Sequence, residues 1–286
     1  MWTRYPFFRC AAGVLAALRF STMVSSANGG AGTELEEGVQ SALLVEVAQC
    51  APGHVFDAGV RLVIPPGAHI YWRNPGDAGL PTELIWELPE GFRAGPMEWP
   101  VPKRFTDGEL ASFGYEGTVV FPVRLTPPPA WPTGRTARIR VRVSWLLCRD
   151  TCVPGSATLE RELPVGTAPI SAQPDAALLR QARRRLPSVA HEVRASFTAD
   201  GERIRVRLSS LSTGHPTLLL PYDGAFLPAA ATPRWVAGPE AGEWHADMPR
   251  APAFPMPSSW FALLILDDGR GLELDIRPLG SSVNQR

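Results

Sequence analysis

Cys148 and Cys152 stand three residues apart in the segment WLLCRDTCVP, where an apolar run ends. Two thiols this close can form a structural disulfide, take part in a metal site, or alternate between dithiol and disulfide in exchange chemistry. A metal site is the least supported, because two thiolates need further Cys or His ligands and none of the five histidines lies near the pair in sequence. We expect no metal or cofactor, and the spacing alone supports a passive disulfide at least as well as a redox pair.

The two cysteines can be joined only if the chain bends between them. Residues four apart on an extended strand are roughly 13 Å from each other, whereas a disulfide keeps its Cα atoms within about 7 Å. A three-residue loop at 149–151 therefore predicts a hairpin. In this register Val143 faces Ala157 on one side of the sheet. Arg140 faces Glu160 on the other side, an opposite-charge pair that cross-strand packing favours.

Alternation along the first strand predicts where the sulfurs point. Within residues 138–144 the odd positions are apolar, whereas the even positions carry arginine or serine and share the parity of Cys148. Cys152 has the outward parity as well, so both sulfurs are expected on the solvent side of the hairpin tip, where exchange chemistry has access. Arg149 would favour a thiolate at Cys148, and Asp150 would partly cancel this effect.

The composition favours an all-β fold. A chain of 286 residues with 45% hydrophobic side chains can form one large or two ordinary domains. Its 30 prolines, 26 glycines and nine tryptophans, set between β-branched runs, indicate short strands joined by tight turns. The 28 basic and 28 acidic side chains balance, which gives no support for a nucleic-acid partner. Hydrolytic chemistry has little support, since G-x-S-x-G and H-E-x-x-H motifs are absent.

Residues 1–27 have the pattern of an export signal. Arg4 and Arg9 precede an apolar run at 10–18, which is too short to span a bilayer. No later apolar stretch is long enough for a membrane span either. We therefore expect a soluble, exported protein in which Cys50 is the odd thiol, buried as a small residue at a strand end.

Turn residues and alternation predict two β-sandwich domains, the second smaller, joined by a short helical linker. The linker at 169–190 should contain a helix from Asp175 to Leu186, with the acidic residue in its first turn and arginines in its last. The predicted domains are 40–168 and a smaller 191–280. Strands are expected at 41–47, 60–64, 69–72, 119–125 and 137–147, a loop-rich stretch at 73–117, and hairpins about Asp200-Gly201 and Asp268-Gly269.

Four segments in order resemble the periplasmic N-terminal domain of the disulfide reductases DsbD and ScsB. They are HIYWRNPGDAGLP (69–81), MEWPVPKRF (97–105), FGYEGTVVFPV (113–123) and WLLCRDTCVPGSATL (145–159). The ScsB-like branch is more similar, because it has the YWRNPGD-type segment and the three-residue cysteine spacing. The resemblance is strong over 43–165 and looser after residue 187. It implies an immunoglobulin-like sandwich whose disulfide passes electrons from a membrane-embedded partner domain to oxidised exported proteins.

The resemblance also implies roles for the cysteines and their neighbours. The attacking cysteine would be the first of the pair, Cys148, and Cys152 would resolve the mixed disulfide. His69 and Tyr71 match a strand position that lines the pair in the family.

A cap loop that shields the sulfurs is a further feature of the family. The matching stretch is 107–115, which includes Asp107 and Glu109, with Phe113 and Tyr115 as the candidate lids. Ordinary strand-end packing of these two aromatics is a serious alternative.

Full-length members of the resembled family carry a multi-span membrane domain and a thioredoxin-like domain after this region, and residues up to 286 contain neither. The expected partners are therefore a separately encoded DsbD- or CcdA-like membrane reductase or a thioredoxin-like donor, together with oxidised periplasmic clients. The alternative function is a non-enzymatic exported binding module in which the disulfide only closes a loop.

Overall fold

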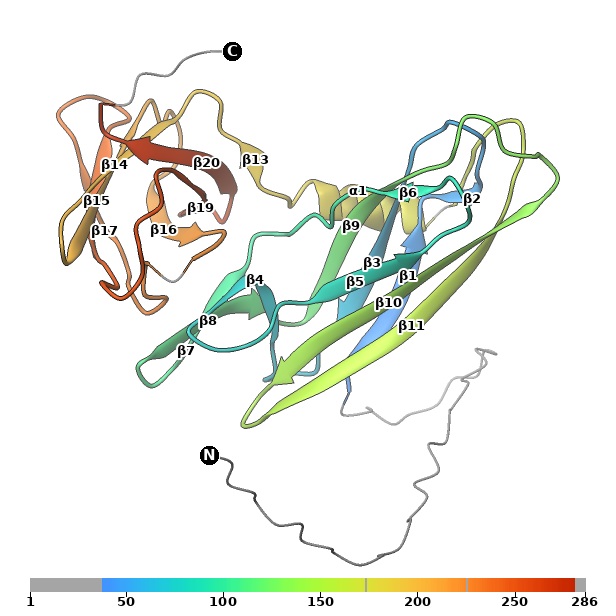
Figure 1. The fold of residues 1–286 in the computed structure, drawn as a ribbon, viewed down its shortest axis with the longest axis horizontal. Coiled ribbons are helices and arrows are strands. Elements are labelled where there is room, and N and C mark those ends of the chain that lie inside the picture. The colour runs from blue at the N-terminus through green and yellow to red at the C-terminus, as the bar shows by residue number, and fades with distance from the viewer. Residues whose placement is uncertain (1–37, 173, 225, 281–286) are drawn as a thin grey trace, which may run out of the picture. The chain divides into compact units, whose positions relative to one another are not determined.

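The computed structural model describes residues 38–172, 174–224 and 226–280, all within one compact unit (Figure 1). The predicted export signal at 1–27 lies outside these residues. The described chain is built of mostly antiparallel strands and one helix, which confirms the all-β, immunoglobulin-like fold class. The predicted division into two domains at 169–190 remains a prediction. Residues 40–171 are called the N-terminal β region and residues 188–278 the C-terminal β region.

The N-terminal β region consists of two main sheets and two smaller groups of strands (Figure 1). One sheet has the order β1 (Gln40–Val45), β3 (Phe56–Val63), β9 (Thr118–Thr126) and β6 (Arg93–Ala94). The other has the order β11 (Cys152–Pro164), β10 (Thr136–Cys148) and β5 (Glu83–Glu87). The smaller groups are β4 (Ile70–Gly76), β8 (Leu110–Tyr115) and β7 (Lys103–Asp107), and β12 (Ile170–Ser171) with β2 (Val47–Gln49).

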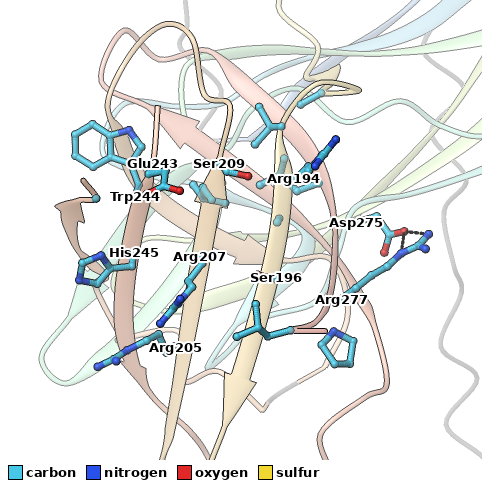
Figure 2. Close-up of a pocket in the computed structure, with 18 of the residues that line it drawn as sticks. Arg194, Ser196, Arg205, Arg207, Ser209, Glu243, Trp244, His245, Asp275 and Arg277 are labelled. Carbon is cyan, nitrogen blue, oxygen red and sulfur yellow. Dashed lines mark hydrogen bonds and ion pairs between the residues drawn. The ribbon is translucent and has the colours of Figure 1, made fainter. Parts of the chain in front are cut away.

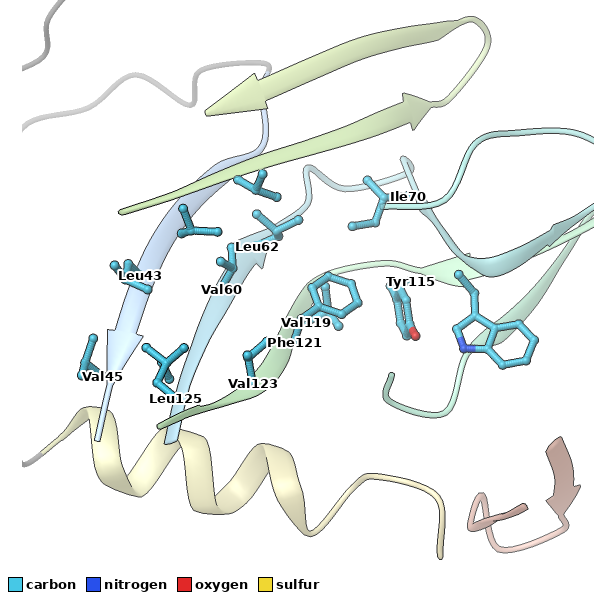
Figure 3. Packing of buried hydrophobic residues seen from close by; sticks show 14 of the residues in the cluster. Leu43, Val45, Val60, Leu62, Ile70, Tyr115, Val119, Phe121, Val123 and Leu125 are labelled. Carbon is cyan, nitrogen blue, oxygen red and sulfur yellow. The ribbon is translucent and has the colours of Figure 1, made fainter. Parts of the chain in front are cut away.

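The core of this region lies between the two main sheets. Alternation along β10 buries Ile139, Val141 and Val143 completely and leaves the arginines between them outside. Figure 3 shows Leu62 and Phe121 among the side chains that fill the space opposite this strand. The long β10–β11 hairpin is therefore anchored by one apolar face along most of its length, and only its tip extends past the core.

The helix α1 (Asp175–Arg183) packs against β1, β3 and β9. Its N-terminal Asp175 and C-terminal arginines are placed as predicted, although the helix ends three residues earlier than Leu186. Leu179 is buried against Gly59, where an added Cβ would lie 2.8 Å from the carbonyl oxygen of Phe121. Glycine at this position thus lets the helix lie directly on the sheet.

The C-terminal β region contains one eight-stranded sheet. Its two predicted hairpins are confirmed, since Ala199 pairs with Ile204 and Ile265 pairs with Gly271. The strands follow the order β16 (Pro216–Pro221), β19 (Trp260–Leu266), β20 (Gly271–Pro278), β14 (Arg194–Ala199), β15 (Arg203–Ser209), β18 (Trp244–Pro249) and β17 (Arg234–Ala237), with β13 (Ser188–Val189) beside β20.

The stretch 73–117, expected to be rich in loops, contains β5, β6, β7 and β8. Prolines keep these strands short, so their alternation is hard to recognise in sequence. Gly114 explains how β8 reaches β4, because an added Cβ there would lie 1.9 Å from the carbonyl oxygen of Ile70. The close backbone contact requires glycine at this position.

Residues that follow Tyr71 on β4 contact the C-terminal β region. The Trp72 ring lies 5.5 Å from the ring of Tyr222, and the Arg73 guanidinium lies 4.4 Å above the same ring. Asn74 donates a hydrogen bond to the carbonyl of Pro221 at 2.7 Å. One short strand therefore contacts both the cysteine hairpin, as described below, and the C-terminal sheet.

The side chain of Arg183 attaches helix α1 to the sheet, and a substitution can test its contribution to stability. Arg183 binds the Asp57 carboxylate through two nitrogens and also pairs with Glu98, and its side chain is only 19% exposed. Arg183→Ala leaves two partly buried carboxylates without their cation, so it should lower the free energy of unfolding by about 2–4 kcal/mol in urea titrations. Arg180→Ala, at an exposed position of the same helix, should cost less than about 0.5 kcal/mol. Equal losses for both variants would contradict this account of the helix anchor.

Candidate functional site

A disulfide joins Cys148 and Cys152 at the tip of the β10–β11 hairpin, with a Cα–Cα distance of 4.1 Å. The predicted register is confirmed over the whole hairpin, since Arg140 faces Glu160 and the two cysteines face each other. Arg140 and Arg138 both bind the Glu160 carboxylate, which stabilises this pairing on the exposed face.

The backbone of Cys148 is bound by the segment that enters β4. The Cys148 N–H donates to the His69 carbonyl and the His69 N–H donates to the Cys148 carbonyl, each at 2.9 Å. Both backbone groups of Cys148 therefore point away from β11. The two cysteines consequently form a non-hydrogen-bonded pair of the hairpin, the type in which facing Cα atoms are closest.

This contact makes the two sulfurs unequal. Cys152 is exposed, whereas Cys148 is only 3% exposed. The prediction that both sulfurs face solvent is therefore correct for Cys152 and wrong for Cys148. Alternation within the hairpin predicts that both cysteine side chains point to the outer face of the sheet. At Cys148, however, this face is covered by β4 and the residue before it, His69.

Tyr71 is the polar group on the buried sulfur. Its hydroxyl donates to Sγ of Cys148 at 2.9 Å and lies 3.7 Å from Sγ of Cys152. Burial raises the pKa of Tyr71, so the phenol stays protonated and remains a donor at neutral pH. Gly79 fixes the ring, because an added Cβ at this residue would lie 2.2 Å from Cε1 of Tyr71.

His69 and Arg149 lie beside the pair, as predicted, but neither places a charge on a sulfur. Burial lowers the pKa of His69, against a smaller opposing effect of Glu116, so the imidazole is neutral at pH 7. The guanidinium of Arg149 donates to the carbonyl of Pro66 at 2.8 Å. The side-chain hydrogen bond on the Cys148 sulfur comes instead from the Tyr71 hydroxyl.

The stretch expected as a cap loop forms the β7–β8 hairpin. Asp107 and Glu109 are exposed at its turn. Phe113 packs edge-on against Trp72 and is buried in the core. Tyr115 is buried too, with its hydroxyl on the carbonyl of Pro100. These contacts fit the alternative of core packing, and a shielding role for the two rings remains a prediction.

Phe105 is a neighbour of the site that was not singled out from the sequence. Its ring stacks on His69 at a centroid distance of 4.4 Å, and His69 in turn meets Tyr71 edge-on at 5.1 Å. A chain of three rings thus leads from β7 to the disulfide. The signal available in the sequence was the position of Phe105 at the end of MEWPVPKRF, one of the family-like segments.

Cys50 is the free thiol of the described chain. It is 1% exposed, and burial raises its pKa, so the prediction of a buried small residue is confirmed. Among the described residues there is no group of three or more His, Cys, Asp or Glu that could hold a metal ion. No helix in this part of the chain is long and apolar enough to cross a membrane.

A hollow of about 1330 Å³ lies over the C-terminal sheet (Figure 2), and no cysteine lines it. Its walls come from β14, β15, β18 and β20 and are rich in arginine. Two of these arginines are neutralised by ion pairs, Arg205 with Asp247 and Arg277 with Asp275. No residue predicted to take part in thiol chemistry lines this hollow.

The cysteine hairpin lies within a segment that matches a known family. Residues 40–164 match the family model "Thiol:disulfide interchange protein DsbD, N-terminal". The N-terminal periplasmic domain of ScsB from Proteus mirabilis has a similar fold, with a TM-score of 0.62 at 14% identity over 87% of this chain and 97% of that one. The major pilin subunit BcpA of Bacillus cereus aligns at a TM-score of only 0.29, with 9% identity over 86% of this chain and 68% of that one. No curated protein sequence matches significantly.

The hydrogen bond from Tyr71 to Cys148 predicts a change in thiol reactivity. In a reduced Cys152→Ser background, Tyr71→Phe removes the donor to the Cys148 thiolate, which should raise its pKa and slow iodoacetamide alkylation at pH 7 by about three- to tenfold. Tyr115→Phe is the matched control, since it removes a phenol hydroxyl that binds a carbonyl elsewhere. Alkylation at the same rate in both double variants would show that the Tyr71 hydroxyl does not stabilise the thiolate.

Proposed function

We propose that the protein, whose residues 40–164 form a DsbD N-terminal-type domain, is a periplasmic thiol–disulfide exchange protein that works through Cys148 and Cys152. The observation that carries the proposal is the asymmetric disulfide at the hairpin tip, with one sulfur exposed and the other bound by a neutral phenol. Electrons come from a membrane-embedded reductase or a thioredoxin-like dithiol donor. They pass to oxidised periplasmic proteins.

The exchange consists of two sulfur displacements. In the reduced protein the Cys152 thiolate attacks one sulfur of a client disulfide, forms a mixed disulfide and releases one client thiolate. The Cys148 thiolate then attacks the Cys152 sulfur and releases the second client thiolate. Two electrons have moved to the client, the Cys148–Cys152 disulfide has formed, and the client thiolates take up the two protons that the cysteines lost. A dithiol donor reverses these steps and restores the reduced protein.

The difference in exposure assigns the two sulfurs different parts in this sequence. Only an exposed sulfur can reach, or be reached by, a sulfur of another protein, which makes Cys152 the partner-facing cysteine. Cys148 is the inner cysteine that closes and opens the intramolecular bond. This order is the reverse of the one that the resemblance implies.

Tyr71 supports the release of Cys148. When a donor thiolate attacks Cys152, Cys148 leaves as a thiolate, and a lower pKa makes it leave faster. The Tyr71 hydroxyl already lies at hydrogen-bond distance from this sulfur in the disulfide form. The bond strengthens as the charge develops, because hydrogen bonds to an ionised acceptor are the stronger ones.

Electron transfer to a disulfide-bonded client tests the proposed function. The protein, reduced with dithiothreitol and freed of reagent, should reduce insulin disulfides and regain the Cys148–Cys152 bond with loss of two thiols per chain. Cys50→Ser should transfer as well as the parent, because Cys50 is buried.

A folded protein that transfers no electrons, or a disulfide that dithiothreitol leaves intact under native conditions, would contradict this function. Such a result would instead favour the exported binding module, in which the disulfide only closes the loop at 149–151.

Variants with one cysteine of the pair test the assigned order. Cys148→Ser retains the exposed sulfur and should form a mixed disulfide with a biotinylated 2-pyridyl disulfide about tenfold or more faster than Cys152→Ser. The rate is read from the release of 2-thiopyridone, and circular dichroism confirms the fold of both variants. Faster trapping by Cys152→Ser would restore the order in which Cys148 attacks.

A further inference from the structure

The strand that carries the exposed cysteine has a free edge. β11 is the last strand of its sheet, beyond β10, as Figure 1 shows. The edge runs from Cys152 towards Glu162, and within residues 38–280 that the structure describes no strand pairs with it. Such an edge presents backbone donors and acceptors that can bind another chain.

The contact between Cys148 and His69 determines which backbone groups lie on this edge. Because Cys148 directs its N–H and C=O to His69, its partner Cys152 directs its own away from β10. The register has no shift along the hairpin, so every second residue after Cys152 does the same. Ser156 and Thr158 therefore present both an N–H and a C=O to the outside.

The positions of two prolines agree with this assignment of the outward-facing backbone groups. Pro154 occupies an outward position, where its missing N–H breaks no hydrogen bond to β10. Pro164 has the same parity, and its carbonyl accepts from the N–H of Cys50 at 3.0 Å, on the side away from β10. The free part of the edge therefore ends before Pro164.

The part of the edge nearest the disulfide carries no charged side chain from Cys152 to Thr158, and Pro154 is its one residue of a kind that usually blocks strand addition. Natural edge strands are protected by charged side chains and prolines. Here Glu160, Arg161 and Glu162 charge the far end, whereas residues 155–159 read GSATL, with small uncharged side chains on the exposed face. An extended chain can approach this backbone without displacing a large side chain.

The direction of sulfur attack leads to the same edge. A thiolate displaces a disulfide sulfur from the side opposite the leaving sulfur. With Cys148 leaving from β10 and Cys152 attacked on β11, the attacking sulfur approaches from beyond β11. This side is opposite to β4 and to the stacked rings of His69 and Phe105.

We propose that the exchange partner docks by adding an extended segment, adjacent to its own redox cysteine, to the edge of β11 at Cys152 to Thr158. This inference rests on the proposed function and adds the mode of partner recognition. Backbone hydrogen bonds from Ser156 and Thr158 align the segment with its sulfur at Cys152. Because backbone groups do the binding, the edge accepts segments of different sequence, which suits a protein that serves several oxidised clients.

The test compares an extended peptide with a small disulfide. The peptide is nine residues long and alternates Thr and Val, except that its central residue is a cysteine in a mixed disulfide with thionitrobenzoate. The small probe is cysteine methyl ester with the same leaving group. In both, the Cys152 thiolate attacks the cysteine sulfur and releases coloured thionitrobenzoate. With the reduced protein the peptide should react about tenfold or more faster, the gain expected from two or more added hydrogen bonds.

Matched variants separate backbone from side-chain effects. Ser156→Pro removes the outward N–H, on an edge that already accepts proline at 154, and should reduce the peptide rate to that of the small probe. Ser156→Ala keeps the N–H and should leave the rate unchanged. A peptide N-methylated on the alternate residues that face β11 should lose its rate advantage over the small probe. Methylation of the residues that face away should leave this advantage. The comparison needs no protein variant.

The outcomes distinguish the docking mode from the proposed function. Failure of the parent protein to react with either probe contradicts the proposed function. Reaction with the small probe but no advantage for the peptide, or an advantage that survives both Ser156→Pro and N-methylation on each edge, overturns docking at β11. A concentration-dependent dimer that Ser156→Pro abolishes would also overturn it, since the edge would then bind a second copy.

Discussion

The pair of backbone hydrogen bonds between Cys148 and His69 determines the layout of the site. It makes the two cysteines a closely spaced, non-hydrogen-bonded pair, and it covers one sulfur while the other stays exposed. The same contact places Tyr71, two residues further along β4, under the buried sulfur. It also determines the hydrogen-bonding direction of β11, and with it the backbone groups on the free edge. One local contact thus makes a symmetric hairpin tip chemically asymmetric.

The scaffold explains how this contact is maintained. The hairpin is rigid below its tip, because Ile139, Val141 and Val143 are buried in the main core. Beyond Ser144, where the pairing of β10 with β5 ends, the edge of β10 is bound by His69 instead. The strand β4 is held in turn by its close approach to Gly114 and by contacts of its later residues with Tyr222.

The hairpin and its register could be predicted from sequence because the signals are local. Alternating valines and facing Arg140 and Glu160 lie within one continuous segment, and a three-residue loop aligns them. The burial of Cys148 could not be predicted in this way, since it depends on His69, which is 79 residues away in the chain. The β7–β8 hairpin was also missed, because prolines interrupt its surroundings and Phe105 joins the site only through stacking on another segment. Local alternation predicts strands, and contacts between distant strands determine which side chains reach the sulfurs.

The central claim is that Cys152 is the sulfur through which the protein exchanges with its partners. The most direct measurement uses the unmodified oxidised protein, treated briefly with glutathione, quenched with acid and digested for peptide mass spectrometry. The structure predicts that the first glutathione adduct is on Cys152, with Cys148 released as a thiol. An adduct on Cys148, or a disulfide that glutathione does not open at all, would contradict the claim.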